Sequence, residues 1–404
     1  MLVPSLTNLS PMSNLSRPRP SFTTLPFWQT FLTGLVVIAS VGDALPNGKE
    51  TANPIYKSSY RIINIHTHAG FPSDATVRAE LDVLDRVGIT AFTVLLAESS
   101  GWPQYQHFAS WSEPNLLTWL DLCKRFPDRL LVFGTLDFRR VVKEPTFFGD
   151  VVLELEQHVR LGMPGVKIWK NLGMHYRDTD GKLLRIDDPR LDPFWQRCGE
   201  LGVPVLIHTA DSKEYWYPKS YNTFQYGAES RDTAKYYQHA EVPKWEELIA
   251  QHNHVLKKHP GTKFIGAHFA NLSDDFDKLA KTLDDYPNLS VECGARLRFM
   301  YRYHPQAIRD FFVKYQDRIL FGTDGFVIAK PQLDDATALR KWQDSRALFY
   351  SRYLEYFETD HLGLTVPDGD SKWMRLTGVN LPPDVLEKFY HANAERLIPA
   401  LKGH

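Results

Sequence analysis

The stretch Ile63-Asn64-Ile65-His66-Thr67-His68-Ala69-Gly70 begins as an apolar strand and ends with two histidines separated by one residue. The residues before it extend the apolar run, which predicts a strand over residues 61–65. Side chains at positions i and i+2 of a strand lie on the same face, so His66 and His68 are expected side by side. Neutral imidazole is a common ligand for divalent transition metals. The pair therefore indicates a metal site, with the lining of a polar pocket as the alternative.

Beyond this stretch, strand-like and helix-like segments alternate along the chain. Further strands are predicted at residues 89–96, 130–136, 165–169, 204–209, 263–268, 289–293 and 318–324. Helical patterns lie between them at residues 78–87, 116–126, 151–161, 193–201, 276–283 and 307–315, with another that ends near residue 258. Several of these helices stop at a glycine, which is typical of a helix C-terminal cap.

The predicted strands are nearly unbroken runs of apolar and β-branched residues, as in a parallel sheet that is covered on both faces. Eight strand–helix units over this length predict an α/β fold, a (β/α)8 TIM barrel, with a doubly wound open sheet as the alternative. Two insertions exceed the barrel: residues 210–243 after strand 5, rich in tyrosine, and residues 325–383 after strand 8, with a helix near 336–357. A final helix over residues 384–401 is expected to pack back on the barrel.

Histidine, lysine and aspartate side chains recur within or at the ends of the predicted strands. They are His66 and His68 in strand 1, Lys167 in strand 4, His208 in strand 5, His268 in strand 6 and Asp324 in strand 8. In a barrel, the C-terminal ends of the strands converge at one rim, where catalytic residues lie. Each residue alone has an ordinary explanation, such as a core histidine or, for Asp324, a turn residue. Their recurrence at the same end of successive strands predicts one shared metal site.

Composition narrows the classes of partner. The 404 residues are 43% hydrophobic and 24% charged, as in an ordinary globular protein. The 47 basic and 48 acidic residues give a formal net charge of -1, which argues against binding to nucleic acid or to an anionic membrane. Cys123, Cys198 and Cys293 are odd in number and lack metal-type spacing, so the sequence does not describe a disulfide scaffold.

Residues 1–44 read as a leader that is distinct from the rest of the chain. Arg17 and Arg19 are the only charges in residues 1–24, and residues 25–41 are almost wholly apolar. This order predicts a signal peptide for export to the periplasm or the extracellular space, followed by a catalytic domain over residues 45–404. An uncleaved membrane anchor is the alternative, because the apolar run approaches a spanning length.

Four short motifs occur in a defined order. They are His66-Thr67-His68, Val205-Leu206-Ile207-His208, Gly266-Ala267-His268 and Gly322-Thr323-Asp324. In this order they resemble the amidohydrolase superfamily of metal-dependent barrel enzymes, and most closely its amidohydrolase-2 branch, which includes the aminocarboxymuconate-semialdehyde decarboxylase-like enzymes. The stretch Tyr390-His391-Ala392-Asn393-Ala394-Glu395-Arg396-Leu397 is similar to the closing helix of that branch. The resemblance extends over residues 61–400, apart from the insertions, and identifies the superfamily rather than the substrate.

The resemblance implies a mononuclear metal site whose ligands are His66, His68, His208 and Asp324. One zinc ion is expected, with manganese, iron or cobalt as alternatives that suit the same ligands, and one position is left for water. Asp324 would also accept the proton of that water, and His268 would stabilise a developing oxyanion or orient the substrate. In binuclear relatives a carboxylated lysine on strand 4 bridges two ions, so Lys167 is the candidate for such a bridge.

Substrate recognition is expected at the same rim. Arg296 and Arg298 follow strand 7, and arginine binds a carboxylate through two parallel hydrogen bonds. Trp169 leaves strand 4 toward the rim. These residues predict a small-molecule substrate that bears a carboxylate. The aromatic insertion over residues 210–243 is interpreted as a lid or as a contact between copies of the chain in a homo-oligomer.

Three functions are consistent with this site. The leading prediction is hydrolysis of a C–N or C–O bond, as in an amide or lactone, by metal-activated water. The alternative is non-oxidative decarboxylation of a carboxylated aromatic or enol acid with the same ligands. The predicted export argues against this alternative, because the family's decarboxylation substrates are mostly intracellular. The third is a barrel that only binds a ligand, against which the complete ligand set argues.

Overall fold

The computed structural model describes residues 54–98, 110–217, 237, 242–365 and 375–401. The predicted leader, residues 1–44, lies outside the described residues, as does most of the aromatic insertion after strand 5. Among the described helices, none is long and apolar enough to span a membrane.

Parallel strands follow one another in chain order through two sheets, β3-β2-β1-β9 and β4-β5-β6-β7-β8. Their bounds are β1 Ile63–His68, β2 Ala91–Leu95, β3 Leu130–Phe133, β4 Val166–Ile168, β5 Val205–Ile207, β6 Phe264–Gly266, β7 Leu289–Glu292, β8 Ile319–Leu320 and β9 Gly325–Phe326. Gly134, just after β3, forms a parallel bridge with Val166 of β4. On the other side, the Ile65 N–H of β1 donates to the Phe321 carbonyl just after β8, at 3.0 Å. The two sheets are thus connected to each other at both edges. This confirms the predicted (β/α)8 barrel rather than the alternative, an open sheet.

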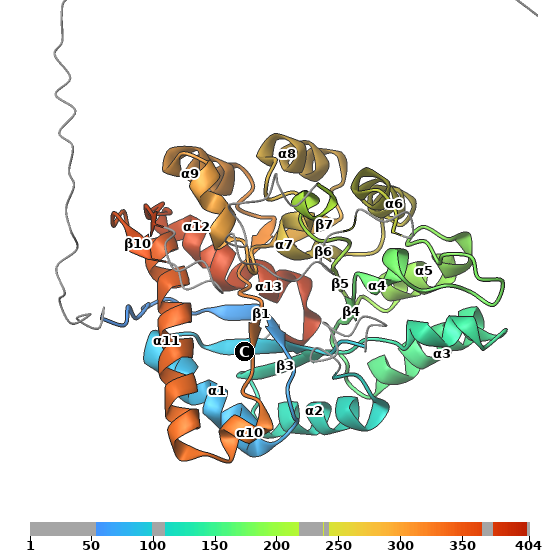
Figure 1. Cartoon of the computed structure of the whole chain (residues 1–404), viewed down its shortest axis with the longest axis horizontal. Helices are drawn as coiled ribbons and strands as arrows, with labels where there is room; N and C mark the ends of the chain where they lie inside the picture. Colours follow the sequence, from blue (N-terminus) through green and yellow to red (C-terminus); the bar gives the residue numbers. More distant parts are fainter. Residues whose placement is uncertain (1–53, 99–109, 218–236, 238–241, 366–374, 402–404) are drawn as a thin grey trace, which may run out of the picture. The chain divides into compact units, whose positions relative to one another are not determined.

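Helices surround the strands on the outside, as Figure 1 shows. The longer ones are α1 Asp74–Val87, α2 Glu113–Arg125, α3 Phe147–Arg160, α5 Asp192–Glu200, α6 Trp245–Lys258, α8 Phe276–Asp285, α9 Pro305–Lys314 and α11 Ala336–Glu358. Gly88 ends α1 in the left-handed conformation, with a φ of 88°, as the sequence predicted. A side chain at this position would meet the Ser58 carbonyl oxygen at 2.3 Å, so glycine is required there.

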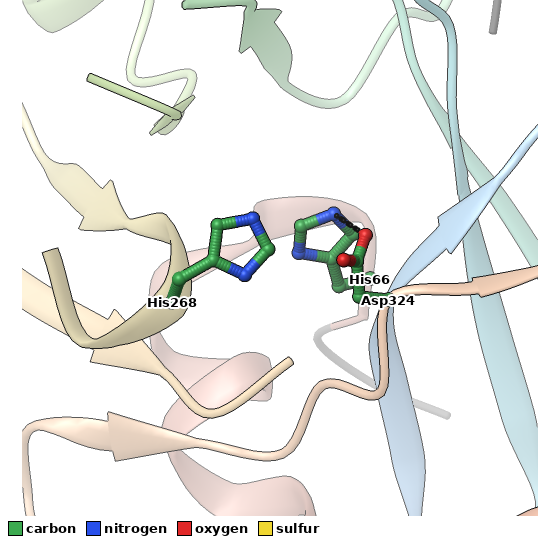
Figure 2. Close-up of side chains that lie close together, drawn as sticks. All are labelled: His66, His268 and Asp324. Carbon is green, nitrogen blue, oxygen red and sulfur yellow. Dashed lines mark ion pairs between the residues drawn. The ribbon is translucent and has the colours of Figure 1, made fainter. Parts of the chain in front are cut away.

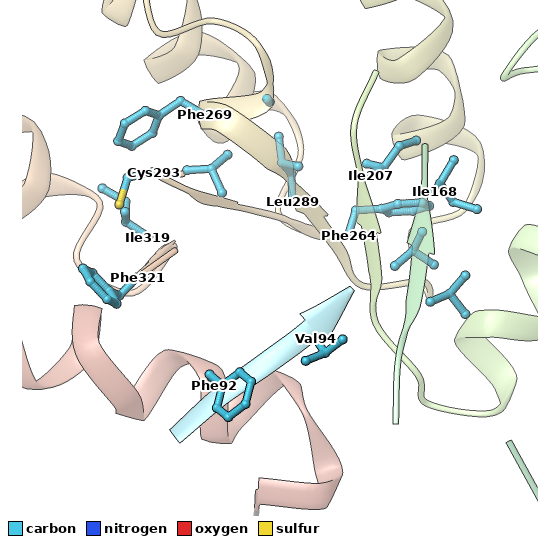
Figure 3. Packing of buried hydrophobic residues seen from close by; sticks show 14 of the residues in the cluster. Phe92, Val94, Ile168, Ile207, Phe264, Phe269, Leu289, Cys293, Ile319 and Phe321 are labelled. Atoms are coloured by element: carbon cyan, nitrogen blue, oxygen red, sulfur yellow. The ribbon is translucent and has the colours of Figure 1, made fainter. Parts of the chain in front are cut away.

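Alternate residues of the strands form two buried layers. The outer layer packs between the strands and the helices; Figure 3 shows part of it, including Phe92, Val94, Ile168, Ile207, Phe264, Leu289 and Ile319. The inner layer fills the barrel and includes Ile63, Ile65, Leu95, Leu131, Leu206, Ile265 and Leu320. This alternation fixes which strand residues face the barrel interior.

The chain's last described segment contributes side chains to the inner layer of the barrel. The sequence predicted one helix over residues 384–401, and this prediction is wrong in form. The segment is divided into α12 Pro383–Glu387, a π-helical turn Lys388–Ala392, α13 Asn393–Leu397 and a 3-10 turn Pro399–Leu401. Ala394, Leu397, Ile398 and Leu401 belong to the inner layer. These four residues follow the i, i+3, i+4, i+7 spacing of one helix face, so the apolar stripe reaches the barrel interior although the segment is divided.

The insertion after β8 begins with a strand that the sequence analysis did not predict. β9 pairs in parallel with the end of β1, where Thr67 lies opposite Gly325. The insertion continues through α10 Lys330–Leu333 and α11, which packs against α1, to the antiparallel pair β10 Leu364–Thr365 and β11 Arg375–Leu376. Asp324 is therefore held between β8 and β9, beside the histidines of β1.

Candidate metal centre

A β-bulge in β1 directs two histidines into the barrel. Ile65 and His66 together lie opposite the single residue Thr93 of β2. Ile65 belongs to the inner layer. Under strict alternation, the side chains of His66 and His68 would therefore face the outer layer. The extra residue shifts the alternation by one, and His68 lies opposite the inward-facing Leu95. Both imidazoles therefore face the interior.

The Asn64 side chain binds the backbone that the bulge disturbs. Its carbonyl oxygen accepts from the His66 N–H and from the Thr323 N–H, each at 3.2 Å. Its amide group donates to the hydroxyls of Thr67, at 3.0 Å, and Thr323, at 2.8 Å. Asn64 is fully buried. The Asn64 side chain thus joins β1 to the segment that carries Asp324. It also accepts from the His66 N–H, which the bulge leaves without a partner in the sheet.

The other strands supply further inward-facing groups by regular alternation. In β4 the neighbours Val166 and Ile168 belong to the outer layer, so Lys167 faces inward. The same parity turns His208, after β5, and Glu292, in β7, into the interior. All three are buried. The N–H of Asp324, which has a φ of 62°, donates to the His66 carbonyl at 2.9 Å.

His268 lies on a left-handed turn directly after β6. His268, Phe269, Ala270 and Asn271 have φ values of 59°, 56°, 51° and 62°. This conformation costs roughly 1–2 kcal/mol for each residue other than glycine, so four in succession must be held by other contacts. The turn folds back on β6, where a side chain at Gly266 would meet the Ala270 Cβ at 2.7 Å. The strain indicates that the position of His268 is specifically maintained.

Three potential ligand atoms, from His66, His268 and Asp324, lie within 4.8 Å of one another. Figure 2 shows the imidazoles of His66 and His268 facing each other, with the Asp324 carboxylate beside His66. An Asp324 oxygen lies 3.1 Å from His66 Nε2 and 2.8 Å from His68 Nε2. The His208 and His268 ring centres are 4.5 Å apart. The structure thus gathers every predicted ligand with His268, and places His268 as close to Asp324 and His66 as a ligand would be.

Hydrogen-bond acceptors fix which imidazole nitrogen carries a proton. His66 Nδ1 lies 3.0 Å from a Glu292 oxygen, and His268 Nδ1 lies 2.8 Å from the Gly294 carbonyl. His208 instead uses Nε2, which lies 2.9 Å from the Ala210 carbonyl. Because these oxygens only accept, the bonded nitrogen is the donor in each case. The opposite nitrogen, Nε2 of His66 and His268 and Nδ1 of His208, is then the one available to a metal or, for His268, to a substrate.

Burial keeps most of the imidazoles neutral. It lowers the pKa of His68 to about 4, and it lowers the pKa values of His208 and His268 well below the ordinary value. Lys167, Lys170 and Arg296 contribute to the lowering at His208 through their positive charges. Neutral imidazole is the form that binds metal, so these rings are ready to coordinate near neutral pH.

The two carboxylates beside His66 are ionised. Burial opposes ionisation of Asp324, but the positive charge of His66 and hydrogen bonds from His66 and His68 hold its pKa well below the usual value. His66 likewise overcomes the effect of burial and holds the pKa of Glu292 at about 2. Burial alone would lower the pKa of His66, yet these carboxylates raise it. The Asp324 side chain remains 21% exposed, so this oxygen ligand lies on the open side of the cluster.

Other predicted residues take different positions around the cluster. Trp169 is buried, with its ring edge-on to those of His68, at 5.5 Å, and His208, at 5.3 Å between centres. Arg296 is also buried, and its Nε donates to the His268 carbonyl at 3.4 Å. The Arg298 side chain, also predicted to bind substrate, lies outside the described residues. Lys167 Nζ lies 5.7 Å from the Trp169 ring centre.

Glu292 and Asn64 were given no role by the sequence analysis. A carboxylate that ends an otherwise apolar strand was a usable signal for Glu292, because such a residue faces the same rim as the histidines. Asn64 gave no comparable signal. Its role depends on the bulge, which arises from the pairing of β1 with distant strands.

The donor set fits a divalent transition metal. Four imidazoles and one carboxylate converge, and His208 Nδ1 is buried without a hydrogen-bond partner among the described residues. Buried polar atoms of this kind are costly unless a ligand satisfies them. Imidazole nitrogen with one carboxylate suits zinc, manganese, iron or cobalt. The predicted ligand roles of His66, His68, His208 and Asp324 therefore stand as a prediction that this geometry supports.

Metal removal is expected to lower the thermal stability of the purified protein. A ligand that binds only the folded state stabilises it by about 2.7 kcal/mol when present at 100 times its Kd. The melting temperature, measured by calorimetry, should fall after dialysis against a chelator and recover on addition of Zn²⁺ or Mn²⁺. Asp324→Asn is the control, because removal of one ligand should abolish most of the shift. An unchanged wild-type melting temperature would contradict a metal site.

The family model described as amidohydrolase matches residues 117–400, so the two histidines of β1 precede the matched part. Similar solved structures include an uncharacterised TIM-barrel protein from Bordetella bronchiseptica, with 17% identity, a TM-score of 0.49, and coverage of 84% of this chain and 99% of that one. No curated protein sequence matches the chain.

Two further similar structures are decarboxylases. The 2,6-dihydroxybenzoate decarboxylase from Rhizobium has 16% identity and a TM-score of 0.45, with 84% of this chain and 98% of that chain covered. The 5-carboxyvanillate decarboxylase from Novosphingobium aromaticivorans, complexed with manganese and 4-hydroxy-3-methoxy-5-nitrobenzoic acid, has 14% identity and a TM-score of 0.43, with 85% and 98% covered. Similarity at this level extends over most of each chain and identifies no substrate.

Proposed function

The chain belongs to the amidohydrolase family, and from this premise we propose that it is a metal-dependent enzyme that decarboxylates a small aromatic or enol acid without an oxidant. The observation that carries the proposal is Lys167. Its ammonium group is fully buried beside the metal cluster, and Nζ has no hydrogen-bond partner among the described residues. Burial lowers the pKa of Lys167 to about 8, with Asp324 and Glu292 opposing that effect. The side chain is therefore mainly a cation at neutral pH, and a substrate carboxylate would satisfy it.

The overall charge of the site also favours an anionic substrate. Lys167, Lys170 and Arg296 are the cations that act on the His208 imidazole, and Asp211, Glu292 and Asp324 are the nearby carboxylates. These charges balance one another. A bound divalent ion would add positive charge to this set of groups, and an acid would then be attracted more strongly than a neutral amide or lactone. This reverses the order of the two reactions predicted from the sequence.

The aromatic surroundings suit a planar substrate. Trp169 contacts the rings of His68 and His208 edge-on, and Phe326 stacks on His68 with ring centres 5.0 Å apart. Aromatic side chains favour offset or edge contacts with a flat ring, which hold it in one orientation. These rings would form walls that favour a planar acid over a flexible chain.

A divalent ion bound by the cluster would act as a Lewis acid toward a substrate oxygen. Lys167 would bind the carboxylate, and the aromatic walls would orient the ring. The bond from the ring carbon to the carboxyl carbon breaks, CO₂ leaves, and the ring carbon takes up one proton that comes ultimately from solvent. The Gly294 carbonyl holds His268 Nδ1, so Nε2 is the atom that can pass this proton.

Hydrolysis of an amide or lactone is the second candidate, and Asp324 is the observation that favours it. Its ionised carboxylate is 21% exposed and lies between His66 and His68, where it could accept the proton of an attacking water. Both reactions use the same ligands. Product identity separates them.

The test is product identity in heavy water. Metal-loaded protein is incubated with hydroxybenzoates and enol acids in D₂O, alongside amides and lactones, and the products are followed by NMR and by CO₂ release. Decarboxylation predicts CO₂ and deuterium at the carbon that lost the carboxylate. Acid release from an amide or lactone, with no CO₂ from any acid, would instead support hydrolysis.

Lys167→Met provides the matched variant for this assay. It keeps the length of the side chain but removes the charge, so kcat/KM for the acid should fall about 10- to 100-fold, in line with about 1.5–3 kcal/mol for a charged hydrogen bond. Lys263→Met is the control, because Lys263 is exposed and lies just before β6. Equal metal content in Lys167→Met and Lys263→Met would exclude a carboxylated Lys167 that bridges two ions. An unchanged kcat/KM in Lys167→Met would show that Lys167 does not bind the substrate.

A further inference from the structure

We propose that Glu292 is a positioning residue that sets two functional groups at once: the tautomer of His66 and the turn that carries His268. This inference rests on the proposed metal site and not on the reaction assigned to it. Glu292 ends β7, faces the barrel interior and is fully buried. It lies behind the histidines rather than among the mutually close ligand atoms.

The Glu292 carboxylate accepts three hydrogen bonds from groups around the metal cluster. One oxygen, Oε1, accepts from His66 Nδ1–H at 3.0 Å and from the His268 backbone N–H at 2.6 Å. The other oxygen, Oε2, accepts from the Gly294 N–H at 2.5 Å. All three donors are held by one rigid group, so the His66 ring and the His268 backbone are fixed relative to each other.

The contact with His66 determines which nitrogen can bind metal. A carboxylate oxygen cannot donate, so a ring proton is held at Nδ1, and Nε2, which lies 3.1 Å from an Asp324 oxygen, is the nitrogen where a metal ion would take the place of a proton. Carboxylates that bind the far nitrogen of a ligand histidine fix its tautomer and orientation and increase its basicity. The observed geometry assigns this role to Glu292.

The contact with His268 stabilises the left-handed turn. Four consecutive residues other than glycine occupy this conformation, beginning at His268, and the first N–H of the run is bound by Glu292. The Gly294 N–H is bound by the same carboxylate, and the Gly294 carbonyl in turn accepts from His268 Nδ1. Glu292 thus binds the backbone of His268 directly and its imidazole through Gly294.

Two glycines make room for this carboxylate. A side chain at Gly322 would meet Glu292 Oε2 at 2.2 Å, and one at Gly294 would meet it at 2.7 Å. The residues around Glu292 are therefore shaped to its position. The backbone approaches the carboxylate closely both just after β7, at Gly294, and just after the neighbouring β8, at Gly322.

Glutamine is not an equivalent replacement. Its amide has one accepting oxygen and one donating nitrogen, whereas all three partners of Glu292 donate. If the oxygen binds His66 and His268, the amide nitrogen opposes the Gly294 N–H. If the group is flipped, the nitrogen opposes the other two. Glu292→Gln therefore keeps the size of the side chain and disrupts the arrangement of donors.

The experiment measures metal affinity and the His66 tautomer in the same proteins. Binding of Zn²⁺ and Mn²⁺ alone is measured by competition with a chelating indicator, and histidine nitrogens are observed by ¹⁵N NMR with His66 assigned by substitution. Glu292→Gln should weaken metal binding about 10- to 100-fold, as loss of such a partner does elsewhere, and His66 should no longer be held as the Nδ1–H tautomer. A purely structural residue would not move the tautomer.

Glu358→Gln is the control, because the Glu358 carboxylate accepts from the hydroxyls of Tyr56 and Tyr390 at 3.0 and 2.9 Å, away from the histidines. It should retain wild-type metal affinity. If Glu292→Gln does not fold, Glu292→Asp is measured instead; it keeps the charge but is one carbon shorter, and the same losses are expected. Wild-type affinity and an unchanged His66 tautomer in the folded Glu292 variant would overturn the inference alone. Absence of metal binding by the wild-type protein would overturn the metal site as well.

Discussion

Asp324→Asn should lose metal and at least about 100-fold in kcat/KM while it remains folded. The carboxylate lies 3.1 Å from His66 Nε2 and 2.8 Å from His68 Nε2, so its charge is part of the cluster. General acid–base groups contribute roughly 10²- to 10⁴-fold to rate, and loss of a ligand adds to this. Metal content by plasma mass spectrometry should fall well below the one equivalent expected of the wild-type protein.

The backbone at this position makes the substitution specific. Asp324 has a φ of 62°, a conformation that asparagine tolerates nearly as well as aspartate. Asp128 has the same φ of 62° but is exposed in the turn before β3, so Asp128→Asn is a matched control. It should retain metal and turnover of whichever substrate the product assay identifies. Full metal content and activity in Asp324→Asn would exclude this carboxylate as a ligand and proton acceptor.

Asn64→Ala should lower both stability and metal affinity, although Asn64 offers no atom to the metal. The variant leaves the buried N–H groups of His66 and Thr323 without their acceptor, at a cost of roughly 1–3 kcal/mol each. Loss of these bonds weakens the bulge that turns the histidines inward. The midpoint of denaturant unfolding and the Kd for Mn²⁺ report these two effects separately.

Asn288→Ala separates a general loss of stability from an effect on the site. The Asn288 amide nitrogen donates to three carbonyls, those of Leu256 and His259 at 3.0 Å and that of Thr262 at 3.2 Å. It lies just before β7, at the end of the strand opposite Glu292. Its replacement should lower the unfolding midpoint but leave the Kd for Mn²⁺ unchanged. If both asparagine variants bind metal equally well, the bulge does not depend on Asn64.

Sequence patterns predicted the strands and most of the helices, because both depend on local periodicity. Unbroken apolar runs marked the barrel strands, and Gly88 marked the end of α1, where a left-handed φ is required. The closing helix was predicted as continuous, since the sequence contains no local sign of the π-helical turn. β9 was missed because two residues cannot show a period; its existence depends on pairing with β1.

Local sequence patterns were sufficient to predict the barrel and the set of residues at its rim: His66, His68, Lys167, His208, His268 and Asp324. They were sufficient because alternating apolar segments are a local property and because parallel strands bring their C-terminal ends together. That the two histidines of β1 face inward depends instead on the pairing of distant segments. Strict alternation from Ile65 would turn them outward, and the bulge that reverses this arises from the register of β1 against β2.

The tertiary structure also decided how these groups are oriented. Glu292 holds the His66 ring and the left-handed turn of His268 through bonds between residues more than twenty positions apart. No local pattern encodes such a contact, because the donors meet the carboxylate only when β1, β6 and β7 are assembled. The sequence therefore determined which chemical groups reach the site, and long-range strand pairing determined which atoms they present to a metal and a substrate.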